Sequence, residues 1–529
     1  MGTDKGVFKD WVPKWLIRGT IVSILAMSLL GFALYYSNME SAIGYYGFEQ
    51  VDIQYSVVLM YATVIAFLAL DNRLIKYFIA RDYIVLGLVL DIISYIVCFY
   101  TRDIILFMIC RFLQGIACAL LCSVVLNLVF PLFHKPKSKV FGYSIFYGGL
   151  QISIPVCAIY CSWLLHFKEF NYLFYGLNIS ILFTLVLVFI TMKRKARFYK
   201  KIPLYQIDWI GAILYTAFCA LLGYLLVYAQ KLNWFESKEF TRLTFVAFIL
   251  LVLFVTRQLL IKRPLINLSL FKYKSFIIGL LLLVALYIFK GTVIFVYVYI
   301  EQILDVDPIH MTPVWIMNIM GIIVGSFVTA RYIIYRAPLI NIIIVGFSLL
   351  ALFHLIMYFT FSSSVEITFF YIPIFIYGLG TSTLFVPVVV FTVSTVPEHL
   401  AYNVSFIGIF SRFVGFCAGL SINNYFQSYT KSEIFERFRE NVNETNYMLG
   451  NTLNSICNDY LSNNQDYMIS NIMSDKYLKN LISGQILIKS TMDYFGIVFI
   501  SILVCIVLLF ISPTIKKVAI RIRERFIPY

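Results

Sequence analysis

Fourteen apolar runs, each long enough to cross a lipid bilayer as a helix, constrain the fold of this chain most strongly. The hydrocarbon layer is about 30 Å thick, and about 20 mostly apolar residues span it as a helix. In lipid, only helices and closed barrels satisfy all backbone polar groups, and runs this continuous are helices. We therefore predict an all-α polytopic membrane protein. The runs cover approximately residues 15–36, 55–70, 83–100, 104–130, 141–165, 171–192, 207–229, 242–261, 275–300, 313–335, 338–361, 367–392, 401–424 and 492–513.

The composition agrees with a membrane protein and excludes several functions. Of the 529 residues, 61% are hydrophobic and 13% charged, against about half and a quarter in soluble domains. The net charge is +15, but lysine and arginine occur in short clusters between apolar runs, as in cytoplasmic loops. We therefore expect no nucleic-acid partner. Nine of the ten cysteines lie in apolar runs and form no metal-ligand pattern, so no metal or cofactor is predicted.

The distribution of charge between successive loops predicts the orientation. One set of loops carries the basic clusters, including the run from Lys193 to Lys201, and the opposite set carries acids such as Glu49 and Asp305. Cytoplasmic loops are enriched in lysine and arginine. We therefore predict that both termini are cytoplasmic, which requires an even number of spans.

The longest polar segment, residues 427–490, separates the last two runs and is predicted to lie on the non-cytoplasmic side. It is rich in asparagine, serine and glutamate, yet Ile434, Phe435 and Phe438 keep helical spacing. Loops this long are functional or disordered in most proteins. We expect partly helical structure and a docking role for this segment.

Four motifs carry a resemblance to a known family. Arg111, Gln114 and Gly115 match an R-x-x-Q-G pattern in the fourth run, and Asp208 begins a D-W-x-G pattern. A P-L-x-x-L-x-L-F pattern covers residues 264–271, where we expect a short surface helix, and an R-x-x-G pattern begins at Arg412. Over nearly its full length the chain resembles the fourteen-span drug/proton antiporters of the major facilitator superfamily, of the EmrB/QacA type.

The resemblance implies a major facilitator fold of six, two and six helices that works by alternating access. It implies the proton gradient as the driving force and a bacterial cytoplasmic (inner) membrane as the location. Gram-negative relatives imply a periplasmic adaptor and an outer-membrane channel as partners, beside the lipid bilayer and a small-molecule substrate. The implied division is a cytoplasmic N-terminus 1–14, a six-helix bundle 15–192, two extra helices within 193–274, a second bundle 275–513 and a basic cytoplasmic tail 514–529.

This chain departs from the family pattern at three places. The loop after the second run keeps Asp71, but Phe67 and Leu74 replace the two glycines of the family motif. The motif of the fifth run survives only as Gly148, Gly149 and Pro155, and the first run has no acid. The fold is therefore expected to be retained more faithfully than the coupling chemistry or the preference for drugs.

Ionisable residues inside apolar runs are the candidates for coupling and substrate binding, because they are costly in the membrane. Asp91 is the only acid well inside a run, and it is expected either to take up protons or to pair with Arg111 or Arg18. Lys290 is expected either to act in transport or to pair with Glu301 or Asp91. The full candidate set is Asp91, Arg111, Gln114, Lys290, Arg412 and Arg18. Predicted helix-packing or gating positions are Asp71, Gly115, Gly148, Gly149, Pro155, Gly378, Gly380, Gly415 and Gly419.

These residues predict a secondary active transporter, with proton-coupled efflux of an amphiphilic or anionic compound as the leading hypothesis. The anionic preference follows because the buried cations outnumber the buried acids. Transport of a metabolite or lipid by the same fold is the alternative. A membrane scaffold or a membrane-embedded enzyme is the alternative of another class, and the five histidines form no catalytic motif that would favour the enzyme.

Overall fold

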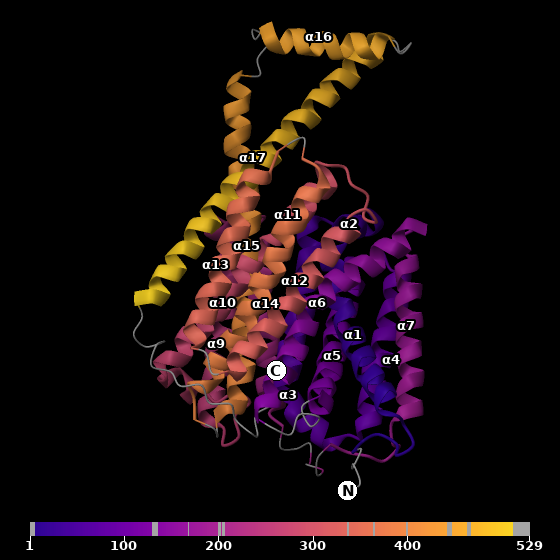
Figure 1. The fold of residues 1–529 in the computed structure, drawn as a ribbon, viewed down its shortest axis with the longest axis vertical. Helices are drawn as coiled ribbons and strands as arrows, with labels where there is room; N and C mark the ends of the chain where they lie inside the picture. The colour runs from indigo at the N-terminus through magenta and orange to yellow at the C-terminus, as the bar shows by residue number, and fades with distance from the viewer. Residues whose placement is uncertain are drawn as a thin grey trace.

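The computed structural model describes residues 6–129, 136–167, 169–198, 201, 203, 207–335, 338–362, 365–397, 400–441, 447–462 and 467–511. Fourteen helical segments in these ranges are long and apolar enough to cross a membrane, which confirms the predicted number (Figure 1). The spanning helices are α1 (Lys14–Ser37), α3 (Gln50–Tyr77), α4 (Ala80–Tyr100), α5 (Ile104–Val129), α6 (Pro136–Phe167), α7 (Tyr172–Thr191), α8 (Trp209–Tyr228), α9 (Lys238–Leu260), α10 (Lys274–Gly291) with α11 (Val293–Gln302), α12 (Thr312–Ile334), α13 (Leu339–Thr360), α14 (Tyr371–Ser394), α15 (Ala401–Asn441) and α17 (Tyr467–Ile511).

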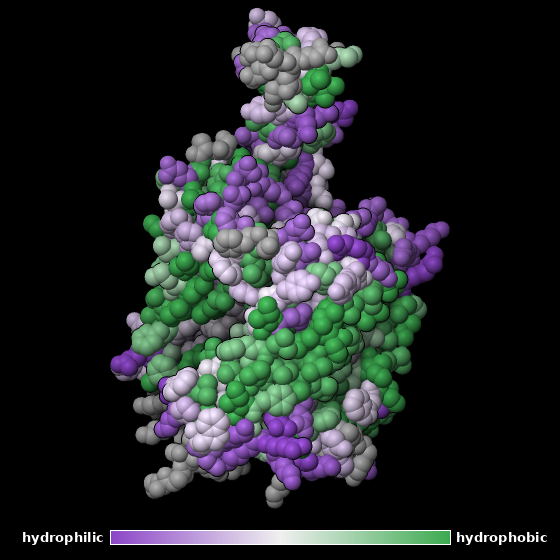
Figure 2. Space-filling view, turned by 90° about the vertical axis from the view of Figure 1, so that its right-hand side faces the viewer, coloured by the Kyte–Doolittle hydropathy of each residue, from purple (hydrophilic) through white to green (hydrophobic). Residues whose placement is uncertain are grey.

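The outer surface of the bundle is apolar where lipid would surround it. Figure 2 shows a broad hydrophobic band across the bundle, with hydrophilic residues gathered on either side of it. Ile179 and Phe183 of α7 are 67% and 63% exposed, and Phe248 of α9 is 61% exposed. Soluble proteins rarely expose contiguous apolar surface on this scale. The chain is a multi-pass membrane protein.

The helices pack as two groups with α8 between them. In the first group α3 packs on α5, α5 on α4, α4 on α7, and α1 on α6. In the second group α14 packs on α12 and α13, α15 packs on α10, and α17 packs on α13. The groups meet where α6 contacts α12 and α3 contacts α15. Helix α8 packs on both α3 and α15, and α9 packs on α8. The predicted domain boundaries remain an interpretation of this arrangement.

Two opposite ends of the bundle are used below as reference points. The N face is the end at which α1 begins and α3 ends, and the α16 face is the end that carries α16 (Tyr447–Ser462) (Figure 1). Helices α15 and α17 continue beyond the bundle at the α16 face and are joined through α16. The expectation that segment 427–490 is partly helical is confirmed for its described residues. The apolar runs 401–424 and 492–513 mark only the membrane portions of these longer helices.

Three local elements bear on the predictions from sequence. The ninth span is interrupted between α10 and α11 at Thr292, and a short helix α2 (Met39–Tyr46) follows α1; neither was predicted. A 3₁₀ turn at Leu268–Lys272 confirms a short helix in the 264–271 motif. Asp208 precedes α8 and accepts a hydrogen bond from the Gly211 N–H, so it caps the helix, because the first turn leaves N–H groups unsatisfied.

Candidate substrate cavity

A cavity of about 160 Å³ lies between the two helix groups. Helices α1, α3, α5 and α6 of the first group line it together with α10 and α15 of the second. Its wall is largely apolar and aromatic, and it includes the charged side chains Lys290 and Arg412. None of the described residues that line it is an aspartate or a glutamate. The cavity is therefore a basic, aromatic site at the position where the groups meet.

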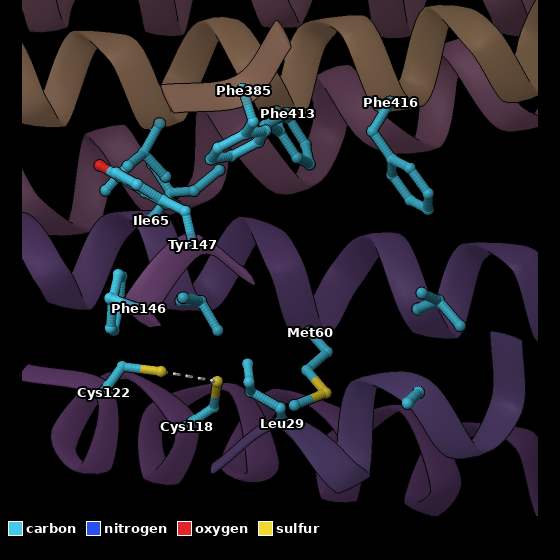
Figure 3. Close-up of a cluster of buried hydrophobic side chains, with 14 of the residues drawn as sticks. Leu29, Met60, Ile65, Cys118, Cys122, Phe146, Tyr147, Phe385, Phe413 and Phe416 are labelled. Atoms are coloured by element: carbon cyan, nitrogen blue, oxygen red, sulfur yellow. Dashed lines mark hydrogen bonds between the residues drawn. The ribbon is translucent and has the colours of Figure 1, made fainter. Parts of the chain in front are cut away.

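Apolar side chains from both groups face one another around this space. Figure 3 shows Phe416 of α15 on one side, and Leu29, Cys118 and Cys122 of the first group on the other; all four line the cavity. The Phe416 ring centre lies 5.8 Å from that of Phe32. Because these walls belong to different helix groups, relative movement of the groups changes the shape of the cavity.

Lys290 lies at the end of α10, just before the interruption of the ninth span. Its Nζ lies 5.8 Å from the centre of the Tyr287 ring, and Arg412 is the charged group that acts on it electrostatically. The ammonium forms no ion pair with Glu301 or Asp91, so the predicted static pair is wrong; both acids are among the described residues. The backbone carbonyl of Lys290 accepts a hydrogen bond of 2.9 Å from the Tyr377 hydroxyl.

Arg412 faces the same cavity from α15 and is 5% exposed. Its guanidinium carbon lies 5.6 Å from the centre of the Phe385 ring and 5.9 Å from that of Tyr147. It also interacts with the phenol of Tyr287. Aromatic faces stabilise a guanidinium without neutralising it. The positive charge of Arg412 is thus held in place by rings and phenols.

Arg111 has a different environment, away from the cavity. It is fully buried on α5, where its Nη1 donates to the Gly31 carbonyl at 2.8 Å and to Gln114 Oε1 at 2.5 Å. Its Nε donates to the Ser56 carbonyl at 3.4 Å. The guanidinium carbon lies 4.5 Å from the centre of the Tyr35 ring. Arg111 and Gln114 therefore connect α1, α3 and α5.

The remaining charged candidates lie apart from Lys290 and Arg412. Asp91 is 4% exposed on α4 and interacts electrostatically with Arg111, but the two form no ion pair. It lies on α4, which packs on α5, and it also interacts electrostatically with the thiol of Cys118, which lines the cavity. Arg18 is exposed on α1 and is not brought to Asp91; the predicted pairing between them is wrong.

Most of the predicted packing positions lie where helices approach closely. A Cβ on Gly115 would lie 2.6 Å from the Met60 carbonyl oxygen, and one on Gly415 would lie 2.7 Å from the Val284 carbonyl oxygen. Small residues allow such approaches between membrane helices. The nearest atoms to the other positions are Ser326 Oγ for Gly148, Leu25 Cδ2 for Gly149, the Asn318 carbonyl oxygen for Gly378, Leu349 Cβ and Leu350 N for Gly380, and Ile288 Cα for Gly419.

Asp71 and Pro155 complete the predicted set. Asp71 is 1% exposed near the N face, where its carboxylate accepts hydrogen bonds from the hydroxyls of Tyr83 and Ser123. It thereby ties α3 to α4 and α5. Pro155 lies inside α6 and lines a small space next to Lys290.

Two contacts near the cavity were missed from the sequence. Gln54 and Asn424 bond to each other between α3 and α15. His354 of α13 is fully buried, and its Nε2 lies 2.9 Å from the hydroxyl of Thr292 at the interruption of the ninth span. Each contact joins residues far apart in the chain, so no local sequence signal indicated it.

The fold and the cavity define a polytopic membrane transporter with a central site between two helix groups. A sequence model of the family described as the Major Facilitator Superfamily matches residues 17–420. This chain belongs to that superfamily.

Individual proteins agree with the family assignment. The multidrug export protein EmrB of Haemophilus influenzae is 22% identical over 289 residues, which cover 53% of each chain. EmrB of Escherichia coli K12 is 24% identical over 251 residues, 46% of this chain and 47% of that protein. The chain thus spans about half the length of the curated relatives it matches. A mutant of the peptide transporter POT, solved in complex with sulfate, has a TM-score of 0.60 at 14% identity over 95% of this chain and 96% of its own, and shows the shared fold.

Proposed function

We propose that this protein is a secondary active transporter that exports an amphiphilic or anionic compound by alternating access, coupled to protons. The observation that carries the proposal is the cavity between the two helix groups, which Lys290 and Arg412 line and whose described lining residues include no aspartate or glutamate. Transporters of this kind bind substrate near the middle of the membrane and rock their halves around it. The name multidrug export protein, carried by both relatives, supports export.

The wall of the cavity supports the substrate class. Phe32, Tyr61 and Phe416 offer apolar faces, while Lys290 and Arg412 offer positive charge. A ligand with an aromatic or aliphatic body and a negative group satisfies both. A purely cationic drug would meet two like charges in a water-poor site, which is costly.

Asp91 is the proposed site of the driving proton, and the proton gradient takes the place of any cofactor. A buried carboxylate that forms no ion pair exchanges a proton more readily than one locked in a pair. Asp91 meets this condition within the described part of the chain, since it is buried and interacts with Arg111 electrostatically without forming an ion pair. It lies outside the cavity lining, so proton and substrate would bind at different places.

The decisive experiment measures flux in proteoliposomes with an imposed pH gradient. Wild type should transport an amphiphilic anion in response to the gradient, and Asp91→Asn should lose this response. Lys290→Ala should lose the flux itself. Asp82→Asn is the matched control, because Asp82 lies exposed on the same helix. Flux that ignores the gradient in wild type contradicts proton coupling.

The projection formed by α15, α16 and α17 is the proposed docking site for a periplasmic adaptor, which would connect this protein to an outer-membrane channel. We place the protein in the bacterial cytoplasmic membrane with this projection on the outer side. Phe435, Tyr467 and Ile472 are 53%, 66% and 68% exposed on it, as expected of a binding surface.

Deleting residues 430–480 should abolish export from cells while the protein remains folded in the membrane. Ile472→Ser is a milder variant that should weaken export, whereas Lys479→Ser, also on α17, should not. Unchanged export after the deletion would contradict the adaptor proposal, and size-exclusion chromatography checks folding.

The alternatives predict different behaviour. A scaffold would tolerate neutralisation of Arg111, Lys290 and Arg412, whereas a transporter would not. A carrier of a metabolite or lipid would move its substrate in the same assay without exporting drugs from cells. We propose that the chain is not an enzyme, in keeping with its membership of a transporter family.

A further inference from the structure

Lys290 and Arg412 differ in one respect that matters for coupling. Both line the cavity, but arginine keeps its proton at every pH that a protein tolerates, whereas lysine can release it when buried. The other titratable groups around Lys290 are the phenols of Tyr36, Tyr61, Tyr287, Tyr297 and Tyr377 and the thiols of α5. Among the described residues, no carboxylate faces it. Among the described residues that line the cavity, Lys290 is therefore the one basic group whose charge can change.

We infer that the cavity binds an organic anion and a proton together, with the proton on Lys290. This inference rests on the proposed function and deepens it, because it assigns the charge relation between substrate and proton. The site takes a monoanion with an aromatic or aliphatic body.

Thermodynamic linkage gives the sign of the effect. An anion is attracted to the ammonium form of Lys290 and not to the neutral amine. Whatever factor the proton adds to anion affinity, the anion adds to proton affinity, because coupling between two ligands is reciprocal. Arg412 attracts the anion equally in both states and so contributes to binding without adding to this coupling.

The geometry makes the ammonium available for this role. Lys290 forms no side-chain hydrogen bond or ion pair within the described part of the chain. Its ammonium lies near the Tyr287 ring and interacts electrostatically with Arg412. An anion between the two cations would interact favourably with both the ammonium of Lys290 and the guanidinium of Arg412. The surrounding rings, including Phe32 and Phe416, would then cover the body of the ligand.

A consequence follows for the direction of coupling. Exchange of a substrate for a proton requires the two to compete, and at Lys290 they cooperate. The proton that drives export must therefore bind elsewhere, and we assign it to Asp91, which is on α4 and outside the lining of the cavity.

The test uses the purified full-length protein and three probes of one shape: 1-naphthoate, the neutral 1-naphthamide and the cationic 1-naphthylmethylammonium. Isothermal titration calorimetry in buffers of different ionisation enthalpy gives the protons taken up for each ligand bound. Wild type should bind naphthoate at least tenfold more tightly than the other two, with proton uptake at some pH between 7 and 10.

Variants at Lys290 separate charge from titration. Lys290→Arg should keep naphthoate binding within about threefold but abolish the uptake, because arginine does not titrate. Lys290→Gln should lose at least tenfold in affinity. Lys274→Gln, at the exposed start of the same helix, should change neither quantity.

Several outcomes would overturn the inference: equal affinity for naphthoate and naphthamide, proton release, no proton uptake at any pH tested, or uptake that persists in Lys290→Arg. Failure of the proposed function is distinguishable. Naphthoate binding with proton uptake but no flux in proteoliposomes would reject export and leave the proposed site at Lys290 intact. Naphthoate flux that persists in Lys290→Gln would support transport and reject the site at Lys290.

Discussion

The side-chain amides of Gln54 and Asn424 exchange two hydrogen bonds, of 3.3 and 2.8 Å, between α3 and α15. The two helices belong to different helix groups. The pair lies toward the α16 face, where it lines a second cavity of about 100 Å³. Gln302 and Glu40 add a hydrogen bond of 3.1 Å at the same face. Any movement that opens the central site toward the α16 face must break the bonds between Gln54 and Asn424.

Gln54→Ala should therefore favour separation of the groups at this face. Hydrogen bonds between membrane helices contribute about 0.6 kcal/mol each on average, so losing both shifts the equilibrium by about 1 kcal/mol, roughly fivefold. Hydrogen–deuterium exchange of residues 50–58 and 420–428 should accelerate by about that factor. Gln427→Ala is the control, since Gln427 lines the same cavity; equal acceleration in both variants would contradict the prediction.

Arg111→Lys should destabilise the first helix group. A lysine cannot donate at once to the carbonyls of Gly31 and Ser56 and to Gln114, all of which Arg111 reaches. Hydrogen bonds from charged groups are worth about 1.5–3 kcal/mol, so a loss of about 2 kcal/mol is expected in thermal unfolding. Arg102→Lys replaces an exposed arginine that stacks on Tyr45 and should cost less than half as much. Equal losses of stability in the two variants would show that the hydrogen bonds of Arg111 contribute no more than the exposed contact of Arg102.

Gly223 of α8 lies at a point where this helix approaches both groups closely. A Cβ there would lie 2.4 Å from Val58 Cγ1 of α3 and 3.3 Å from Phe413 Cζ of α15. Gly223→Ala should cost about 1–3 kcal/mol, as overpacking does. Adding Val58→Ala should recover most of the loss, while Gly19→Ala, with open space around it, should be neutral. A thermal midpoint that the second change does not restore would contradict this packing.

Acid should weaken the junction between α8 and α9 through Asp208, which immediately precedes the span Trp209–Tyr228. Burial opposes ionisation of its carboxyl, but hydrogen bonds from Arg257, the Gly211 N–H and Gln258 outweigh burial and lower its pKa. A carboxyl with a lowered pKa stabilises the fold above its unfolded pKa of about 3.9, and this stabilisation is lost as the pH falls through the folded pKa.

Thermal midpoints between pH 3 and 7 measure the contribution of Asp208. The thermal midpoint of wild type should decrease below about pH 4. Asp208→Asn should have a lower midpoint at neutral pH, and its midpoint should fall less steeply between about pH 4 and pH 3. Asp10→Asn, at an exposed ion pair with Lys193, should keep the wild-type profile. If the midpoint of Asp208→Asn falls at low pH as steeply as that of wild type, other carboxyls cause the loss of stability in acid.

The number and identity of the spans were predictable because polar groups are costly in lipid, so each span must be a continuous apolar run that is visible in the sequence. The ends of α15 and α17 were not, since a helix continues into water wherever its own residues favour it, and hydropathy does not record this. The interruption at Thr292 was also missed. It is stabilised by His354 from α13, a contact that sequence alone does not reveal.

The charged residues of the candidate site were predictable from the sequence, but which of them lie close together was not. Lys290, Arg412, Arg111 and Asp91 stood out as charges inside apolar runs. Which of them share an environment depends on how helices from the two groups face each other. Arg412 meets Tyr147 of the first group, and Lys290 meets Arg412 rather than Glu301.

The length of α17 has a mechanical consequence. Its 45 residues form a rod of about 68 Å, more than twice the roughly 30 Å of hydrocarbon. It packs on α13 and α15 within the second group and carries α16 at its far end. Displacement grows with distance from a pivot, so a small rotation of this group near Arg412 becomes a larger sweep of α16. A rotation of the second group would therefore require α16 to move. A binder that immobilises α16 should arrest transport without reaching the cavity.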